Sequence, residues 1–452
     1  MKYGARIHGG SRGARRRGQA LVPVVFVVMV VTAFAVVLTG VARRELRAAA
    51  ASTRHTRMFY VARGAVNYAA VQLQQATSGG TTYPELTSPP DTDSNGWTML
   101  GDGWYKIDII DTAARVNINT ATAAGLNTLP GLSSDPSIGL AIVDWRDSDD
   151  TPGTLEGSIG AESEYYLALP APYAPKNGPF DTVDELLLVR GITPSLLYGS
   201  PSTAGARSGS RQSGDPLETG QSSIPLAEML TTYSRERNVA SDGTRRINVK
   251  TADADTLVST LGLPPQVAQR LIEQRGQNGA NLSSIAGLLD IPGFTRQIMQ
   301  QIGDKITVTD DEYRAGVINI NTAPAEVLAA IPNVDQTIYN AVIEARQGGT
   351  VFTGLNDLFQ LTALNRQQLQ ALVDNVCTKS SVYLVRIKVR ERGAREVRAF
   401  QALIEVQPPT QAEDGTEVAA QPKVYQFREV GSDPGWRSWT TGAFASGGSI
   451  GF

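Results

Sequence analysis

Seven carboxylates crowd one short stretch of the sequence and are the residues best placed to do chemistry. They fall within 21 residues and are Asp144, Asp147, Asp149, Asp150, Glu156, Glu162 and Glu164. So many carboxylates repel one another unless a cation holds them, and Ca²⁺ prefers several oxygen ligands in flexible geometry. A solvated acidic loop with Arg146 as its partner is the alternative, and the residues alone favour that alternative.

A second acidic pattern runs from Asp91 to Asp102 and has the order Asp-Thr-Asp-Ser-Asn-Gly. It fits the ligand order of an EF-hand loop, with Asp102 in place of the final glutamate. Pro89 and Pro90 stand where such a loop has its incoming helix. Turns rich in Asp and Asn before a strand have the same composition without any metal. We therefore expect a turn here rather than a calcium site.

Composition excludes several other kinds of site. The 452 residues contain two histidines, His8 and His55, and one cysteine, Cys377, so a disulfide framework and a histidine-based zinc site are excluded. The sequence has no phosphate-binding P-loop pattern, and we expect no enzymatic activity. A net charge of −3 excludes nucleic-acid binding driven by overall charge.

An internal repeat supplies the elements that would position the acidic stretch. Three segments share one pattern, Asn-x-Asn/Lys-Thr-Ala followed by a Leu/Ile-rich turn; they are residues 116–132, 247–263 and 318–334. Each predicts an extended start, a short helix and a tight turn. The first helices are expected to be capped by Thr120, Thr251 and Thr322. The second helices are expected at residues 138–146, 267–275 and 338–346. Such repetition indicates supersecondary units that share cores.

Strand-like segments flank this helical region. Residues 104–110 precede it, and residues 382–390 and 397–406 follow it as a hairpin of alternating apolar and polar side chains. A further strand is expected at residues 423–430. A strand before and a hairpin after the repeats predict one antiparallel sheet interrupted by a large helical insertion, an α+β fold.

The N-terminus predicts a membrane anchor. Residues 1–18 carry six basic residues and no acid, and residues 20–42 carry no charge. At a helical rise of about 1.5 Å per residue, the uncharged run reaches roughly 34 Å, enough to cross a bilayer. The basic cluster holds the N-terminus in the cytoplasm. Helix formers continue to residue 76. Over the second half of this helix, one apolar stripe at spacings of three and four can dock on a sheet; it comprises Ala62, Ala65, Ala69 and Leu73.

This beginning resembles a type IV prepilin or pseudopilin, a family whose leader is cut after a glycine. By resemblance, cleavage by the prepilin peptidase follows Gly18, and Gln19 becomes the methylated mature N-terminus. The usual glutamate at the fifth mature position is replaced by Pro23. That departure resembles the K-type minor pseudopilin of type II secretion. Further motifs similar to this type lie in residues 141–150, 160–166 and 176–192.

The resemblance implies a function in assembly. It implies a single-pass inner-membrane protein with a periplasmic globular part, which caps the tip of the pseudopilus and helps to initiate it for protein export. The implied partners are minor pseudopilins I and J, with H as a further candidate. The K-type relatives carry calcium in their first helical region, which points to Asp147, Asp149, Asp150 and Glu162 as ligands, with Glu164 in reserve.

The repeats resemble the helix-hairpin-helix module, which opens an alternative function. A pseudopilin of an uptake or adhesion pilus would bind DNA with these hairpins. The turns at Gly131, Gly262 and Asn333 lack the second glycine of DNA-binding versions, and Pro264 and Pro265 have no N–H to donate. We therefore favour protein packing and expect no nucleic-acid partner.

These interpretations give one domain plan. It comprises a basic leader (1–18), a transmembrane and pilin-type helix (19–76), the first part of the sheet (77–116), a first repeat with the acidic loop (117–200), a Ser/Gly-rich linker (201–223), a second repeat (224–310), a third repeat (316–378), the returning hairpin (379–406) and a flexible tail (407–452). The third repeat is expected to be an addition to the plan of the family.

Overall fold

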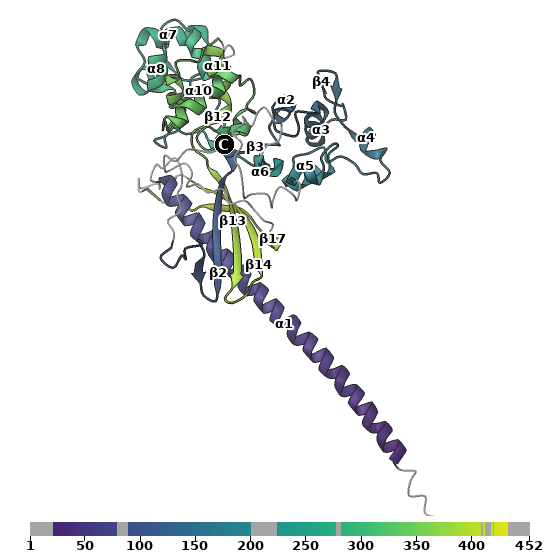
Figure 1. The fold of residues 1–452 in the computed structure, drawn as a ribbon. Coiled ribbons are helices and arrows are strands. Elements are labelled where there is room, and N and C mark those ends of the chain that lie inside the picture. The colour runs from purple at the N-terminus through teal and green to yellow at the C-terminus, as the bar shows by residue number, and fades with distance from the viewer. Residues whose placement is uncertain are drawn as a thin grey trace, which may run out of the picture. The chain divides into compact units, whose positions relative to one another are not determined.

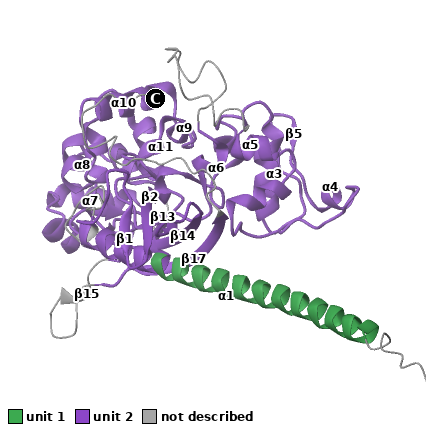
Figure 2. Ribbon diagram, turned by 60° about the horizontal axis from the view of Figure 1, so that its bottom comes forward, with its two compact units in different colours: residues 1–61 green, residues 62–452 purple. Residues whose placement is uncertain are grey.

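The computed structural model describes residues 21–78, 89–199, 224–276, 282–407, 410–411, 417–418 and 420–432. The leader, the cleavage positions Gly18 and Gln19 and the expected linker 201–223 lie outside the described residues, as do residues 433–452 of the tail. The chain divides into two compact units, Met1–Val61 and Ala62–Phe452, which Figure 2 shows in different colours.

The first unit contains the start of one long helix, α1 (Leu21–Ser78). This helix is long and apolar enough to cross a membrane by its length and composition. Two polar side chains of the apolar run form hydrogen bonds within the helix. The hydroxyls of Thr32 and Thr39 each donate to the carbonyl oxygen four residues back at 2.6 Å. Polar groups of an apolar span need such internal partners. Pro23 lies in the first turn of the described helix, where proline is tolerated.

The end of α1 belongs to the second unit and packs along the sheet (Figure 1). The predicted stripe is buried: Ala62, Ala65, Ala69 and Leu73 have no exposed surface. Small side chains allow this close packing. Gln74 fixes the register, since its Nε2 donates to the carbonyl of Gln407 at 2.5 Å and its Oε1 accepts from the N–H of Gln407 at 3.1 Å.

The sheet is antiparallel with the order β1-β2-β13-β14-β17. Its strands are β1 (Thr98–Leu100), β2 (Gly103–Asp111), β13 (Val382–Glu391), β14 (Val397–Glu405) and β17 (Lys423–Ser432). The neighbours β2 and β13 pair along their whole lengths, with Ile107 opposite Ile387. Residues 112–381 are thus inserted between two adjacent strands. The predicted α+β fold, with its interrupted sheet, is confirmed.

The insertion contains three repeats that share one hydrophobic core. The first repeat comprises η1 (Thr112–Ala114), β3 (Val116–Asn117), α2 (Ala123–Leu126), α3 (Pro136–Arg146), β4 (Thr154–Leu155), β5 (Ser158–Ile159), α4 (Ser163–Leu167), η2 (Val183–Leu188), α5 (Pro194–Tyr198), α6 (Leu226–Met229) and β6 (Leu230–Thr231). The second comprises β7 (Arg235–Arg237), β8 (Ile247–Asn248), the π-helical η4 (Thr256–Thr260), α7 (Pro265–Gln274), η6 (Ile285–Asp290), α8 (Arg296–Ile302) and β9 (Ile306–Thr307). After β10 (Tyr313–Ala315), the third comprises β11 (Ile318–Asn319), α9 (Ala325–Leu328), α10 (Gln336–Gln347), η7 (Leu355–Gln360), α11 (Arg366–Asn375) and β12 (Val376–Cys377). A further short hairpin, β15 (Thr410–Gln411) with β16 (Glu417–Val418), follows the sheet hairpin.

Each repeat is closed by a parallel pair of short strands, β3 with β6, β8 with β9 and β11 with β12. An arginine at the end of the second helix braces the first turn of each repeat. Arg146, Arg275 and Arg346 donate to backbone carbonyls at the start of their own repeats, for example Arg275 to Val249 at 2.9 Å. The repeated sequence pattern therefore corresponds to a repeated set of arginine–backbone hydrogen bonds.

The predicted threonine caps are wrong. Helix α2 is capped two residues later, by Thr122, whose hydroxyl accepts from the N–H of Gly125 at 3.1 Å. Thr120 instead donates its hydroxyl to the carbonyl of Asn117 at 3.4 Å. Thr251 has the same contact in its repeat, and Thr322 donates to Asp111. The reason is that the Asn-x-Asn/Lys-Thr segment first forms a turn, which delays the start of the helix.

Candidate metal centre

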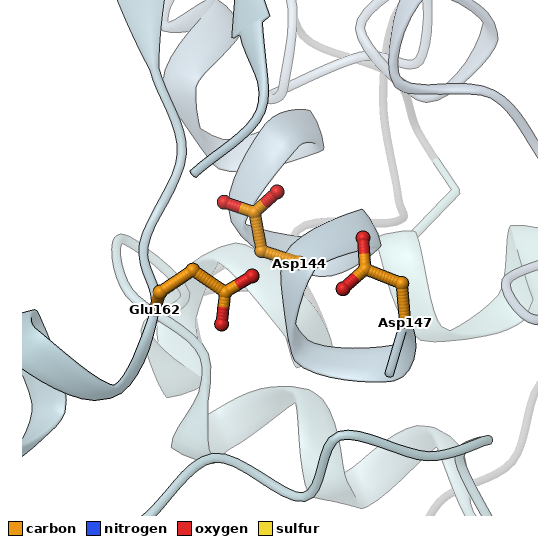
Figure 3. A group of neighbouring side chains, drawn as sticks. All are labelled: Asp144, Asp147 and Glu162. Carbon is orange, nitrogen blue, oxygen red and sulfur yellow. The ribbon is translucent and has the colours of Figure 1, made fainter. Parts of the chain in front are cut away.

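Three carboxylates meet in the first repeat, as Figure 3 shows. Asp144, Asp147 and Glu162 each offer an oxygen, and these oxygens all lie within 4.8 Å of one another. Asp144 and Glu162 are buried, with exposed fractions of 1% and 2%, and Asp147 is half-buried. Among the described residues, no lysine or arginine forms an ion pair with any of the three.

Local structure explains how the three side chains converge. Asp144 lies in the last turn of α3, and Asp147 follows as the residue that ends this helix. The β4–β5 hairpin then returns the chain to Glu162, which precedes α4 but makes no side-chain cap bond to it. Glycine is required at the hairpin base, since a Cβ on Gly160 would lie 1.7 Å from Oδ2 of Asp144. Glycine at this position thus leaves room for the carboxylate of Asp144.

The cluster brings like charges close together in a buried place. Burial, followed by the charges of Asp144 and Asp147, raises the pKa of Glu162 to about 7. Burial also raises the pKa values of Asp144 and Asp147. Oδ2 of Asp144, Oδ1 of Asp147 and both carboxylate oxygens of Glu162 are buried without a hydrogen-bond partner. Buried polar oxygens normally have partners, so four buried oxygens without one make this cluster a candidate cation site.

The donor set fits a hard cation. All three side chains offer oxygen, and neither histidine nor cysteine takes part, which suits Ca²⁺ and disfavours Zn²⁺. Asn177 lies beside the cluster with a left-handed backbone (φ 44°), and its Oδ1 is also buried without a partner. Its Nδ2 donates to the carbonyl of Asp149 at 3.3 Å. A bound ion would neutralise the carboxylates and tie the end of α3 to the start of α4.

The structure groups two of the four predicted ligands, Asp147 and Glu162, with Asp144. The other two lie exposed at the rim with partners of their own. Asp149 accepts from the N–H of Thr151 at 2.9 Å, and Asp150 accepts from the hydroxyl of Ser163 at 2.6 Å. Glu164, the reserve ligand, is exposed on α4. Asp144 was part of the acidic cluster in the sequence, and its place directly before Trp145 and Arg146 gave no signal that separated it from its neighbours.

The second acidic loop forms a turn. Oδ1 of Asp93 accepts from the N–H groups of Asn95 and Trp97 at 2.8 and 2.9 Å, and Gly96 adopts a left-handed conformation. Asp102 lies in the connection between β1 and β2. Within the part of the chain that the structure describes, Asp91, Asp93 and Asp102 form no three-carboxylate group close enough for one ion.

The hairpin turns offer little to a phosphate. Gly131, Gly262 and Asn333 occupy equivalent left-handed positions, with φ of 88°, 72° and 61°. In the second repeat, the N–H groups of Gly262 and Leu263 already donate to Val258 and Leu257 within the turn. Pro264 and Pro265 follow and have no N–H. This turn therefore lacks the free donors that a phosphate needs.

An apolar helix that leads into an antiparallel sheet, with hairpin repeats inserted between adjacent strands, is the architecture predicted for a pseudopilin. The comparisons with known proteins agree. The family described as type II secretion system (T2SS), protein K matches residues 114–198 and again residues 318–379. A helix-hairpin-helix motif matches residues 243–307. The predicted resemblance is confirmed: the chain carries the protein K segments of the type II secretion family.

Individual relatives are more distant. The chain is 28% identical over 207 residues to the type II secretion system protein K of Klebsiella pneumoniae, an alignment that covers 40% of this chain and 60% of that protein. The chain thus spans about 60% of the length of this curated relative. The crystal structure of the GspK-GspI-GspJ complex from enterotoxigenic Escherichia coli aligns with 84% of this chain and 98% of that chain, at 13% identity and a TM-score of 0.38.

One expectation needs correction. The third repeat, residues 316–378, was expected to be an addition to the family plan. The protein K family matches residues 318–379, which are that repeat almost to the residue. The third repeat is therefore part of what defines the family, and the second repeat is the one matched only by a general helix-hairpin-helix motif.

Proposed function

We propose that this protein is a non-enzymatic minor pseudopilin that caps the tip of a type II secretion pseudopilus and helps to initiate its assembly. The observation that carries the proposal is the pair of protein K segments inserted between β2 and β13, in a chain whose helix α1 can cross a membrane. Three inserted repeats form a broad head, and a head of this size suits the end of a filament rather than its shaft.

The proposed location follows from the N-terminus. Six basic residues before the apolar run favour an N-terminus in the cytoplasm and a globular part in the periplasm of the cell. The proposed partners are minor pseudopilins I and J, as in the Escherichia coli complex, with H as a further candidate. Pro23 supports the tip position, because a chain without the usual glutamate cannot pair with the N-terminal amine of a subunit ahead of it.

We further propose that the head binds Ca²⁺ through Asp144, Asp147 and Glu162. Their convergence and their orphaned oxygens support this. When bound, the ion supplies positive charge in addition to that of Arg146 and Arg190, which lie near the cluster. The residues hold α3 and α4 together around it, so the ion has a structural role.

The test of the class is the mature N-terminus. The protein is extracted from membranes of cells with and without the prepilin peptidase and examined by intact-mass and N-terminal mass spectrometry. We expect a start at methylated Gln19 only when the peptidase is present. An intact leader in both samples would contradict the pseudopilin class, and the chain would then be a signal-anchored protein that shares the head.

DNA binding is the second candidate, and the helix-hairpin-helix match at residues 243–307 is the observation in its favour. It predicts binding to duplex DNA that falls steeply with salt, because phosphate contacts release counterions. The occupied N–H groups of Gly262 and Leu263 argue against it. Salt-dependent binding by the head, measured by fluorescence anisotropy and lost when Lys250 is replaced, would support this candidate over packing.

A further inference from the structure

The second and third repeats pair with each other through the same two elements. Helix α8 packs on η7, and in return α11 packs on η6. The exchange is reciprocal in its polar contacts as well. Arg366 at the start of α11 pairs with Asp290 at the end of η6, and Arg296 at the start of α8 donates to the carbonyls of Leu361 and Leu364 beyond η7. The arrangement is that of an isologous interface, in which equivalent surfaces of the two partners contact each other reciprocally.

The pairing of the second and third repeats buries apolar side chains of both 3-10 helices, η6 and η7. Ile285 begins η6 and Leu355 begins η7, and both are buried. Phe359, the fifth residue of η7, is fully buried, and Gln300 of α8 donates to its carbonyl at 3.2 Å. The second residue of η6, Ala286, is likewise buried. The pairing therefore has an apolar centre.

The first repeat has the equivalent elements, η2 and α5, but several of their apolar side chains remain exposed. We call this surface the η2–α5 face, defined by Val183, Leu187, Leu188, Pro194 and Tyr198. Leu187 corresponds to Phe359 and is 37% exposed, and Leu188 and Tyr198 are 48% and 46% exposed. Helix α6 packs on α5 but leaves these side chains open.

Sequence differences at this face point to what covers it. Leu188 stands where the second repeat has Asp290, and Pro194 stands where the third repeat has Arg366. Both members of the ion pair that joins the paired repeats are thus apolar in the first repeat. Because both replacements lie in one chain, a two-fold axis would bring Leu188 of one copy against Pro194 of another and repeat that contact on the other side of the axis.

We infer that the η2–α5 face docks on the η2–α5 face of a second copy of this chain, as η6–α8 docks on η7–α11. The carboxylates at its edge already have partners. Asp184 accepts from the hydroxyl of Tyr198 at 2.8 Å, and Lys176 joins Asp181 and Glu185. Residues 200–223 lie outside the described residues and contain one large apolar side chain, Leu217, so their composition is poorly suited to cover the face.

The proposed pairing requires neither the pseudopilus nor calcium. A test of the pairing is therefore independent of a test of the proposed function. Without the arginine contacts of the other repeats, the pairing would rest on apolar area alone. We therefore expect a weak association, which is best detected in the membrane, where the local concentration of the protein is high.

Site-directed cross-linking tests the pairing in full-length protein. Cys377 is buried, so an introduced cysteine is the accessible thiol. One chain carries Leu188→Cys and a differently tagged chain carries Pro194→Cys, and both are co-expressed and oxidised in membranes. We expect a disulfide-linked dimer of the two tags, reduced about tenfold by Leu187→Asp in each chain, as expected for the loss of about 1.4 kcal/mol. Val351→Cys, on an exposed apolar residue of the third repeat, replaces Leu188→Cys in the control.

Three results would overturn the inference. The first is equal cross-linking in the Val351→Cys control, and the second is no dimer in either pair. The third is a product of another kind. A cross-link to a protein of different mass would assign the face to that partner, and a disulfide between Leu188→Cys and Leu217→Cys within one chain would assign it to the chain's own segment. Each of the variants changes an exposed side chain or one outside the described residues, so loss of the fold does not confuse the outcome.

Discussion

The first and third repeats are built on one scaffold and differ in one connection. In the third repeat, residues 348–351 join the end of α10 to Phe352. In the first, residues 147–179 join the end of α3 to Phe180, and this long connection carries Asp147 and Glu162. The scaffold on either side is closely similar, and the longer connection adds buried side chains such as Tyr166 to the core of the first repeat.

An asparagine closes both repeats in the same way. Asn119 accepts from the N–H of Phe180 at 2.8 Å and donates to the carbonyls of Phe180 and Thr232. Asn321 makes the same contacts with Phe352 and Thr378. The comparison teaches that hydrogen bonds to the backbone hold the repeat together, whereas the buried carboxylates of the first repeat oppose folding unless a cation is bound.

The largest effect is expected from Asn321→Ala. This side chain is 1% exposed, and its removal leaves one N–H and two carbonyls buried without partners. We expect the free energy of unfolding to fall by about 4 kcal/mol, and by roughly half of that for the half-buried Asn119 in Asn119→Ala. Urea unfolding followed by circular dichroism measures both. No loss in either variant, or a larger loss in Asn119→Ala than in Asn321→Ala, would contradict this account of how the repeats close.

Calcium is expected to stabilise the first repeat only. At a free concentration of roughly 100 times its dissociation constant, it should add about 2.7 kcal/mol to the free energy of unfolding. Differential scanning calorimetry with and without a chelator measures this, and Mg²⁺, which demands a more rigid geometry, is the control. Amide exchange should show the gain at residues 144–162. A gain confined to the third repeat would contradict the assignment.

The pH dependence of the metal-free protein sharpens the comparison further. The carboxyl pKa of Glu162 is raised from its ordinary value of 4.5 to about 7, chiefly by burial. The folded state therefore binds more protons than the unfolded state between these values, and the free energy of unfolding falls as the pH rises through this range. Glu162→Gln should weaken this fall and stabilise the metal-free protein above neutral pH. A fall of the same size in the variant would place the proton elsewhere.

The smallest effect is expected in the second repeat, which has Lys250 where the others have the closing asparagine. The N–H of Lys250 donates to Oδ1 of Asn248 at 3.0 Å, so the turn has the same shape as in the other repeats. Lys250→Asn should therefore raise the free energy of unfolding by about 0.5 to 1 kcal/mol over Lys250→Ala, the worth of an added hydrogen bond. The same urea titration is sufficient, and a loss of stability would show that the second repeat closes differently.

Sequence reasoning predicted the scaffold well because its signals are local and repeated. The Asn-x-Asn/Lys-Thr-Ala pattern marked all three repeats, and the alternation of residues 382–406 marked the hairpin that becomes β13 and β14. The threonine caps were placed wrongly because a turn and a helix start both favour this residue type, and the sequence does not show which one forms first.

The candidate site was predicted only in part. Seven carboxylates marked the region, but a carboxylate on a helix and one in a loop look alike in sequence. Asp144 is buried by the return of the β4–β5 hairpin, which depends on Gly153 and Gly160 beside its carboxylate. Asp149 and Asp150, which looked equally suitable, point to other partners at the surface. Only the tertiary fold separates the two groups.

The measurement that tests the central claim most directly is a calcium titration of the purified full-length protein by isothermal titration calorimetry, with Asp144→Asn and Asp149→Asn beside it. Asp144→Asn keeps the oxygen that accepts from the N–H of Gly153 at 3.0 Å and removes one charge from the buried cluster. We predict saturable binding to the natural protein, binding at least tenfold weaker in Asp144→Asn and nearly unchanged binding in Asp149→Asn, since each tenfold step is about 1.4 kcal/mol. Calcium binding that depends on Asp149 and not on Asp144, or no binding at all, would contradict the account.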